Sequence, residues 1–290
     1  MSEIKKCFPS RWGADGRIVE TDFSQLEIVG VAFLSGDENL KDDIRKGRDL
    51  HCMSASFLFN TPYEDIYKAV KVDNDPMWQK RRKAAKSPSF QLQYGAGYKS
   101  IAKKCGLTEK QAKTFVENYY GRYKQLKEWQ EENIREVNRN RQITDKRSQA
   151  GYQLGIGYLH GPTGRAYAFM EEEAPDFLKE KGTMTSFQPT QIKNYPSQGF
   201  ATGDLVPMCL GELYYELKAN EQLRDKALLV NTVHDSVILD VHTSVQECAI
   251  STVEEVLTSA PHYLKMQFGI EFDLPINVET SVGLTWGETA

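Results

Sequence analysis

The chain has 290 residues, of which 40% are hydrophobic, 26% charged and 11% aromatic, and its formal net charge is −4. These values are ordinary for globular proteins and exclude a disordered, collagen-like or disulfide-dense chain. No apolar run reaches the ~18 residues that a membrane helix needs, and the first residues lack the apolar region of a signal peptide. We therefore expect a cytoplasmic protein of about two domains with no membrane contact and reduced cysteines.

Positive charge is concentrated in one segment. Between Pro76 and Thr108 the chain carries eight Lys or Arg and no Asp or Glu, whereas the rest carries 28 basic against 40 acidic residues and sums to −12. A basic island on an acidic body indicates an element that faces phosphate groups. The structural alternative is a solvated helix face, although such faces usually mix both signs.

The first elements of the chain have clear signals. Residues 17–23 are β-branched and follow a Gly-Ala-Asp-Gly turn, which predicts a strand. Ser24 is the expected cap of the helix that follows, with Glu27 at the capping-box position. Helical periodicity then dominates residues 62–137, with two interruptions by Gly, Pro, Asp and Asn.

The second half of the chain is more uneven. Residues 138–200 are rich in Gly, Pro and Tyr, and their pattern predicts no definite element. Residues 227–233 and 236–241 are apolar and separated by only two residues, which is typical of a tight β-hairpin. Residues 246–268 have the pattern of a helix, and a last extended piece runs to Trp286.

Two aspartates stand at the edges of strongly apolar strands, Asp22 after the first strand and Asp235 in the hairpin turn. A carboxylate in such a place is costly unless it is paired, hydrogen-bonded or bound to a cation. Two carboxylates that meet across a sheet could hold two Mg²⁺ ions about 3.5–4 Å apart, the arrangement used in phosphoryl transfer. Taken singly, each aspartate is more often a turn residue than a metal ligand.

Between them lie Arg82, Lys86, Phe90 and Tyr94, spaced by four, so that on an α-helix all four project from one broad face. A face that is cationic at one end and aromatic at the other suits a nucleoside triphosphate. The structural alternative is an amphipathic helix with an aromatic core side and a cationic rim. Pro88 costs about 3 kcal/mol inside a regular helix, so a kink or break is expected between Lys86 and Phe90.

These three segments resemble the motifs of family A DNA polymerases, the bacterial polymerase I type. Asp22-Phe-Ser-Gln-Leu-Glu27 resembles motif A, the Arg82 to Tyr94 series followed by Gly95 resembles motif B, and Val233-His-Asp235 resembles motif C. The motifs occur in the order of the family, and the resemblance extends from about Lys5 to the Gly-Leu-Thr-Trp segment that ends at Trp286.

The resemblance implies an α/β (α+β) fold. The palm, an antiparallel sheet backed by helices, would be built from residues 1–48 and 190–290. A mainly helical fingers insertion would occupy residues 49–189.

The resemblance also implies a role for each residue that matches a motif. The catalytic residues would be Asp22, Asp235 and Lys86, and two Mg²⁺ ions would be held by Asp22, Asp235 and the carbonyl of Phe23. The incoming deoxynucleoside triphosphate would be bound by Gln25, Glu27, His51, Arg82, Phe90 and Tyr94. Primer-template DNA would be contacted by Asn194, Gln198 and His234. For His51 and His234 the structural alternative is a buried, hydrogen-bonded histidine.

Some positions depart from the family's pattern. Ser236 follows the motif C aspartate, where the family usually has Glu. The related single-subunit RNA polymerases also have Ser at this position. Thr190 stands where the family usually has Arg. Glu27, the expected gate against a ribose 2′-hydroxyl, and Phe90 favour deoxynucleotides. Only about 21 residues precede Asp22, which leaves no room for a thumb or an exonuclease domain.

The function that we expect is template-directed DNA synthesis by a palm and fingers chain. A second polypeptide would supply the thumb, with or without an exonuclease, as in a split bacteriophage polymerase that works in the cytoplasm of a bacterial host; the alternative origin is an excised fragment. An acidic body would repel duplex DNA, so the partner would also supply positive charge. Two other functions stay open: a fragment of a single-subunit-type RNA polymerase, and a non-catalytic assembly subunit of a replication complex.

Overall fold

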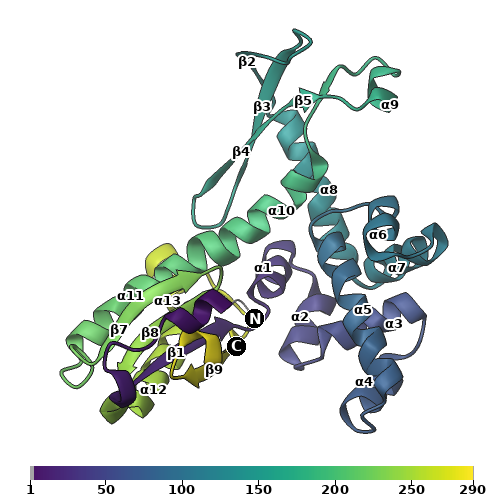
Figure 1. The fold of residues 1–290 in the computed structure, drawn as a ribbon. Helices are drawn as coiled ribbons and strands as arrows, with labels where there is room; N and C mark the ends of the chain where they lie inside the picture. Colours follow the sequence, from purple (N-terminus) through teal and green to yellow (C-terminus); the bar gives the residue numbers. More distant parts are fainter. Residues whose placement is uncertain (1–2, 290) are drawn as a thin grey trace. The chain divides into compact units, whose positions relative to one another are not determined.

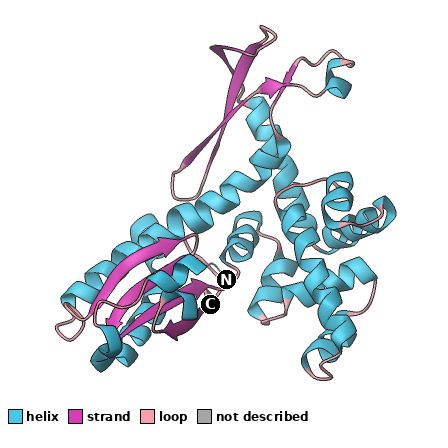
Figure 2. Ribbon diagram, in the orientation of Figure 1, coloured by secondary structure: helices cyan, strands magenta, loops and turns pink. Residues whose placement is uncertain are grey.

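The computed structural model describes residues 3–289, which form two compact units of mixed helix and antiparallel sheet, as the sequence predicted (Figures 1 and 2). The first, here called the sheet unit, comprises the chain up to Gly30 and from Gln198 onward; the second, the helical unit, is Val31–Ser197. These units are defined by contacts alone, and the palm and fingers bounds of 1–48, 49–189 and 190–290 stay a prediction. One boundary falls inside helix α1, Leu26–Ser35.

The sheet unit is built on four antiparallel strands in the order β7-β8-β1-β9. The strands are β1 (Gly16–Phe23), β7 (Ala227–Val233), β8 (Ser236–His242) and β9 (Val278–Gly283). The predicted strand and hairpin are therefore confirmed. Helices α11 (Val206–Ala219), α12 (Gln246–Thr258) and α13 (Ala260–Phe268) pack together, with α12 against the sheet (Figure 1).

The other face of the sheet is covered by two short 3-10 helices from the ends of the chain. These are η1 (Glu3–Cys7) and η5 (Trp286–Glu288), which contact each other. Short 3-10 turns also occur at Gly13–Asp15 and Thr243–Val245. Because side chains alternate along a strand, Ile18, Glu20 and Asp22 of β1 share this face.

Two details of the sheet unit correct the sequence analysis. Helix α1 begins at Leu26, and the carbonyl of Gln25 accepts from the N–H groups of Ile28 and Val29, so the residue before the first turn is Gln25 and not the expected Ser24. The helix expected over 246–268 is two helices, divided at Ser259. The reason is Pro261, which lacks an N–H and fits only the first turn of a new helix.

The helical unit confirms the periodicity of residues 62–137 and its interruptions. After α1 come α2 (Glu38–Arg45), α3 (Leu50–Phe59), α4 (Tyr63–Lys71), α5 (Pro76–Gln93), α6 (Tyr98–Cys105), α7 (Glu109–Arg122) and α8 (Lys124–Arg139). Helix α3 packs against both α5 and α7. A buried carboxylate, Asp43, joins distant parts of the unit because it accepts from the guanidinium of Arg122 and from Tyr123 Oη at 2.8 Å.

The segment that the sequence left unassigned contains a small sheet. Its strands are β2 (Gln142–Arg147), β3 (Gln153–His160) and β4 (Ala166–Met170), followed by the β5 and β6 pair (Glu172–Glu173 and Thr185–Ser186), α9 (Asp176–Lys179) and α10 (Pro189–Gln198). A π-helical stretch, Gly199–Leu205, continues from α10 to α11. The missed signal was the alternation of residues 166–170 after a Gly-Pro-Thr-Gly turn.

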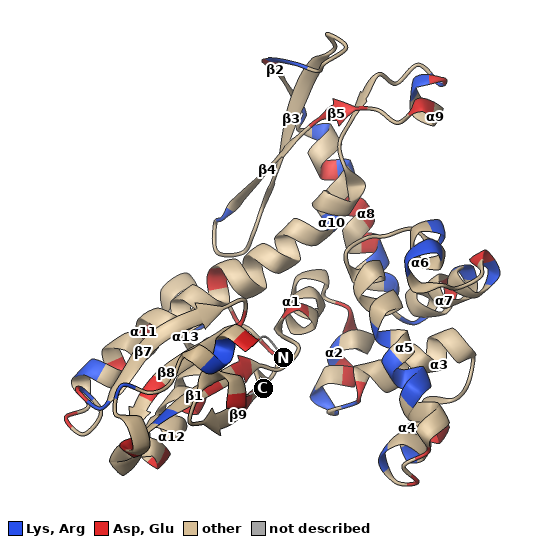
Figure 3. Cartoon of the chain, viewed as in Figure 1, with Lys and Arg blue, Asp and Glu red and all other residues tan. Residues whose placement is uncertain are grey.

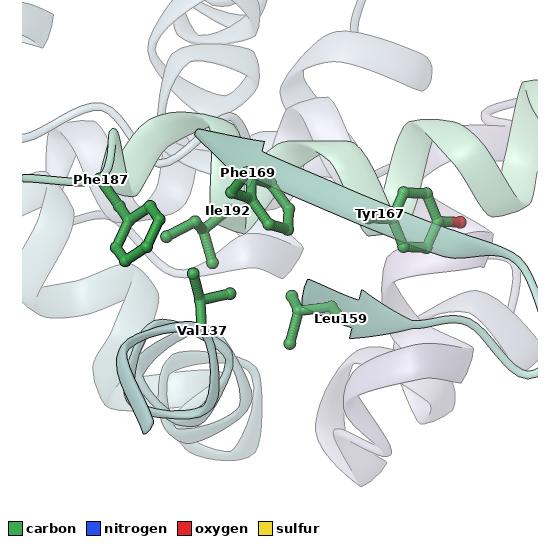
Figure 4. Packing of buried hydrophobic residues seen from close by; sticks show 6 residues of the cluster. All are labelled: Val137, Leu159, Tyr167, Phe169, Phe187 and Ile192. Carbon is green, nitrogen blue, oxygen red and sulfur yellow. The ribbon is translucent and has the colours of Figure 1, made fainter. Parts of the chain in front are cut away.

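Apolar side chains from four elements and one connecting segment hold this small sheet against its neighbouring helices (Figure 4). The cluster consists of Val137 from α8, Leu159 from β3, Tyr167 and Phe169 from β4, Phe187, and Ile192 from α10. Strand β3 lies very close to α8, because a Cβ at Gly157 would stand 2.4 Å from the carbonyl oxygen of Val137. Among residues 3–289, no helix has the length and apolar character that a bilayer span requires.

A buried ion pair ties the small sheet together, and it gives a test of the fold. Glu171 accepts from Arg141 Nε and Nη2 at 2.8 and 2.7 Å, from the Gly155 N–H at 2.7 Å and from Thr185 Oγ1 at 3.1 Å. Burial would raise the pKa of Glu171, but these donors outweigh it, so the pKa is lowered.

We expect Glu171→Gln to lower the free energy of unfolding by about 2 kcal/mol at neutral pH, because charged hydrogen bonds are lost. A carboxylate with a lowered pKa stabilises the fold above its unfolded pKa, and this contribution disappears as the pH falls through the folded pKa. Urea unfolding of both proteins at pH 7 and at about pH 3.5 checks this. A difference between them that stays constant with pH would contradict the assignment.

Candidate active site

The sheet brings Asp22 and Asp235 to the same edge. Asp22 is the penultimate residue of β1, and Asp235 is the second residue of the turn between β7 and β8. Strands β1 and β8 are antiparallel with Asp22 opposite Ser236, and the Phe23 N–H lies 3.5 Å from the Asp235 carbonyl oxygen. Two carboxylates that are remote in sequence thus stand at neighbouring strand ends.

The charges at this edge repel one another. Burial raises the pKa of Asp235, and the negative charges of Asp22 and Glu27 raise it further, whereas a hydrogen bond from its own backbone N–H and, to a smaller extent, the charge of His234 lower it. A bound cation would relieve this repulsion, since an opposite charge favours the ionised carboxylate.

The donor set at this edge suits a hard cation with an open coordination sphere. Within residues 3–289, no group of three or more His, Cys, Asp or Glu side chains is arranged to hold a metal ion. Mg²⁺ is commonly bound by only one or two carboxylates, with substrate phosphates and water as the other ligands. Asp22 and Asp235 fit that pattern, and the family resemblance implies the Phe23 carbonyl as a further ligand.

The turn that carries Asp235 is under backbone strain. His234 has φ 59°, in the left-handed region, although it is not glycine. This conformation costs an ordinary residue about 1–2 kcal/mol. The side chain is exposed, so His234 is not the buried histidine of the structural alternative. Strain of this kind persists only where the surrounding structure enforces it, and it is frequent at functional sites.

Three other predicted site residues belong to the sheet unit: Gln25 and Glu27 follow Asp22 closely in the sequence, and Gln198 contacts Glu27. Glu27 is in the first turn of α1, and Gln198 Nε2 lies 3.5 Å from its Oε1. Gln25 is exposed and, like His234, has a positive φ, 55°. Asn194, the remaining predicted DNA contact, is on α10 within the helical unit.

Three of the predicted nucleotide-binding and catalytic residues, His51, Arg82 and Lys86, line a pocket of about 530 Å³ in the helical unit. Four of the eight residues that line it are cationic: the lining consists of His51, Val70, Lys71, Asn74, Gln79, Arg82, Lys83 and Lys86. Burial lowers the pKa of His51, and the charges of Arg82 and Lys86 lower it further, so the imidazole is neutral at neutral pH. The pocket is therefore positive through its Lys and Arg side chains and suits an anion.

Arg82 is held by a partner that the sequence analysis missed. Its Nε and Nη2 lie 3.0 and 2.7 Å from Asp49 Oδ2, a bidentate contact, and Lys71 Nζ lies 3.5 Å from the same oxygen. Asp49 also caps α3, because its Oδ1 accepts from the N–H groups of His51 and Cys52. One carboxylate thus orients both Arg82 and the helix end that carries His51. An Asp just before a helix is a common N-cap, and that signal could have identified it.

The aromatic half of the predicted series continues along the same helix. The Lys86 ammonium lies 5.7 Å from the Phe90 ring centroid, and the Phe90 ring is 6.4 Å from that of Tyr94 and 6.2 Å from that of His51. Helix α5 runs without interruption from Pro76 to Gln93, so the expected break between Lys86 and Phe90 is wrong, whereas a kink there stays a prediction. The Pro88 ring is buried, and packing of α5 against α3 offsets the lost backbone hydrogen bond.

Charge is divided between the two units. The sheet unit has 19 Asp or Glu against 8 Lys or Arg, a net −11, and the helical unit has 28 Lys or Arg against 21 Asp or Glu, a net +7. Figure 3 shows Lys and Arg in blue on α5 and α6, the two helices that contain the predicted basic island. The acidic strand ends and the cationic pocket thus belong to parts of opposite charge.

Comparison with known proteins identifies the family. The family model for DNA polymerase family A matches residues 1–288. The chain belongs to DNA polymerase family A. Among its relatives, DNA polymerase I of Lactococcus lactis subsp. lactis is 29% identical over 288 residues, and the thermostable DNA polymerase I of Thermus filiformis is 28% identical over 285. The alignments cover 99% and 98% of this chain but 27% and 28% of those proteins, so the chain spans less than a third of their length.

A solved structure shows the same fold. The POL domain of Pol1 from M. smegmatis, in complex with DNA primer-template and dNTP, matches with a TM-score of 0.69 at 20% identity, over 99% of this chain and 42% of that one. The predicted fold of a family A polymerase is therefore confirmed.

The bidentate Asp49–Arg82 pair gives a test within this family A chain. We expect Asp49→Asn to lower the free energy of unfolding by about 1–2 kcal/mol, because the amide still caps α3 but loses the charged contact to Arg82. Asp42→Asn is the matched control: its partner Lys46 is exposed, and surface pairs contribute about 0–1 kcal/mol. Urea unfolding measures both, and equal losses would contradict a special role for Asp49.

Proposed function

We propose that this chain catalyses template-directed DNA synthesis, the transfer of deoxynucleotides to a primer 3′-hydroxyl. The observation that carries the proposal is the β1–β8 register, which puts Asp22 and Asp235 at one strand edge in a family A chain. The complex of the M. smegmatis POL domain with primer-template and dNTP supports this substrate class.

In the proposed reaction the primer 3′-hydroxyl attacks the α-phosphate and pyrophosphate leaves. Two Mg²⁺ ions, when bound, would supply charge stabilisation for the attacking and leaving oxygens. Asp22, Asp235 and the carbonyl of Phe23 would hold them. Asp22 lies on a paired strand and Asp235 lies in the tight turn directly before its neighbour β8, so both carboxylates would hold the positive charge at a fixed place.

The cationic pocket is the proposed site for the triphosphate. Lys86 and Arg82 supply positive charge along α5, and the bidentate contact with Asp49 keeps the Arg82 guanidinium in a fixed orientation. A neutral His51 can donate one hydrogen bond to a phosphate oxygen. Phe90 and Tyr94 present rings for the sugar and the templating position, a stacking contact that all four bases can make.

Sugar selection is proposed for Glu27. Its side chain stands beside Gln198 and close enough to Asp235 to raise the pKa of that residue. A carboxylate there would exclude a ribose 2′-hydroxyl by size and would leave a deoxyribose unhindered. Gln25 would assist at the nucleotide, whereas Asn194, Gln198 and His234 would contact the primer-template.

Duplex binding is proposed to depend on positive charge from outside these two units. Duplex affinity comes mainly from Lys and Arg that neutralise phosphates, and the sheet unit has a net charge of −11. A second polypeptide with a thumb is the source that we propose. Primer extension with and without co-purified proteins tests this.

Loss of a metal-binding carboxylate gives the main test. We expect Asp22→Ala and Asp235→Ala each to slow primer extension about a thousandfold, equivalent to ~4 kcal/mol of barrier. Both variants should fold, since each carboxylate lies at a strand end. The matched control is Asp225→Ala, an exposed acid of the same unit, which should retain full activity. Near-normal extension by Asp235→Ala would refute the site.

Glu27 gives an independent test of substrate class. Glu27→Ala should raise incorporation of ribonucleotides relative to deoxynucleotides by about tenfold or more, because the side chain that occupies the 2′ position is gone. Single-nucleotide extension with each substrate measures the ratio. Equal use of both nucleotides by the unaltered chain would instead favour the RNA polymerase alternative.

A further inference from the structure

A second carboxylate on β1, which no motif singled out, is buried beside the proposed metal-binding pair. Glu20 lies two residues before Asp22 on the same face of the strand, and it is only 5% exposed. A buried charge of this kind persists only when it is paired and hydrogen-bonded. Its partners therefore show what the charge holds in place.

Donors from four segments converge on this one side chain. Glu20 Oε1 accepts from Ser236 Oγ at 2.9 Å, from Trp286 Nε1 at 3.0 Å and from Lys5 Nζ at 3.4 Å, and Oε2 accepts from Thr289 Oγ1. Lys5 belongs to η1, Trp286 to η5 and Thr289 to the residues after it. Three of the four donors thus come from the segments that cover the sheet.

The fourth donor leads to the hairpin turn. Ser236 follows Asp235 directly, stands opposite Asp22 in the β1–β8 register and is itself 5% exposed. On its other side the turn contains His234, whose left-handed backbone must be held by its surroundings. The Ser236 hydroxyl is therefore a polar tie between β1 and the first residue after the strained turn.

We propose that Glu20 is a positioning residue for the metal-binding pair: through the Ser236 hydroxyl it holds the β7–β8 turn so that the Asp235 carboxylate faces Asp22. The inference rests on the proposed function, since it concerns the same two aspartates. It also assigns a task to Ser236, the position where the motif departs from its family. In this chain the residue after the motif C aspartate carries a hydroxyl that donates a hydrogen bond to an acid on the neighbouring strand.

The network separates this role from a purely structural one. Thr289 Oγ1 donates to the other oxygen of Glu20 and to the Trp286 carbonyl, so its removal weakens the cluster but leaves the Glu20–Ser236 hydrogen bond in place. Ser236→Ala and Thr289→Val each delete one hydroxyl that donates to the same carboxylate. A positioning role predicts that only the first substitution changes metal affinity.

The test is Mn²⁺ binding by the full chain without nucleotide or DNA, followed by electron paramagnetic resonance of the free ion. We expect Ser236→Ala to weaken Mn²⁺ binding about fivefold, equivalent to about 1 kcal/mol for one hydrogen bond. Glu20→Gln, which keeps an acceptor oxygen but loses the charge, should weaken it to a smaller extent. Thr289→Val should lower the melting temperature and leave Mn²⁺ affinity within twofold of the unaltered chain.

Each other outcome overturns the inference in a recognisable way. Unchanged affinity in folded Ser236→Ala and Glu20→Gln would show that Glu20 supports the fold alone, and so would an equal loss in Thr289→Val. Asp235→Asn separates this result from a failure of the proposed function. If the unaltered chain binds no Mn²⁺, or if Asp235→Asn leaves the Mn²⁺ affinity unchanged, then both the proposed metal site and the positioning role of Glu20 are wrong.

Discussion

The pairing of β1 with β8 is the constraint on which the rest of the candidate site depends. Because side chains alternate along a strand, the register that puts Asp22 opposite Ser236 also decides which face each acid occupies. A slip of one residue would turn Asp22 toward the helices and would bury an unpaired charge there, at a cost of several kcal/mol. The register is thus enforced by the same charges that the proposed chemistry needs.

The two units contribute opposite kinds of chemistry. The sheet unit concentrates carboxylates, which suit cations, and the helical unit concentrates Lys and Arg around a pocket, which suits phosphates. Within the helical unit, the negative charge of Asp49 partly offsets the positive charge of the pocket, and its hydrogen bonds hold the Arg82 guanidinium in one orientation.

Much of this arrangement could be predicted from the sequence, and the failures have physical reasons. The hairpin around His234 and Asp235 was predictable because its period and turn length are local properties. The small sheet at β2 to β4 was missed because Gly and Tyr weakened the alternation, and its stability comes from the cluster around Val137 and Phe169. Helix α5 continued through Pro88 because tertiary packing outweighed a local penalty. Asp49 and Glu20 were missed as functional candidates because their partners are distant in sequence.

Two buried acids, Glu20 and Asp240, lie on the face of the sheet that the chain ends cover, at positions where apolar side chains would also fit. Asp240 accepts from Ser10 Oγ and from the Arg11 N–H, as Glu20 does from Lys5 and η5, so both chain ends are tied to the two central strands. Apolar packing could stabilise this face equally well, but it tolerates small shifts between layers. A hydrogen bond fails when its donor and acceptor move by an ångström. Polar ties are therefore better suited to fix the strand pair that carries Asp22 and Asp235, where the direction of each carboxylate matters more than the total stability.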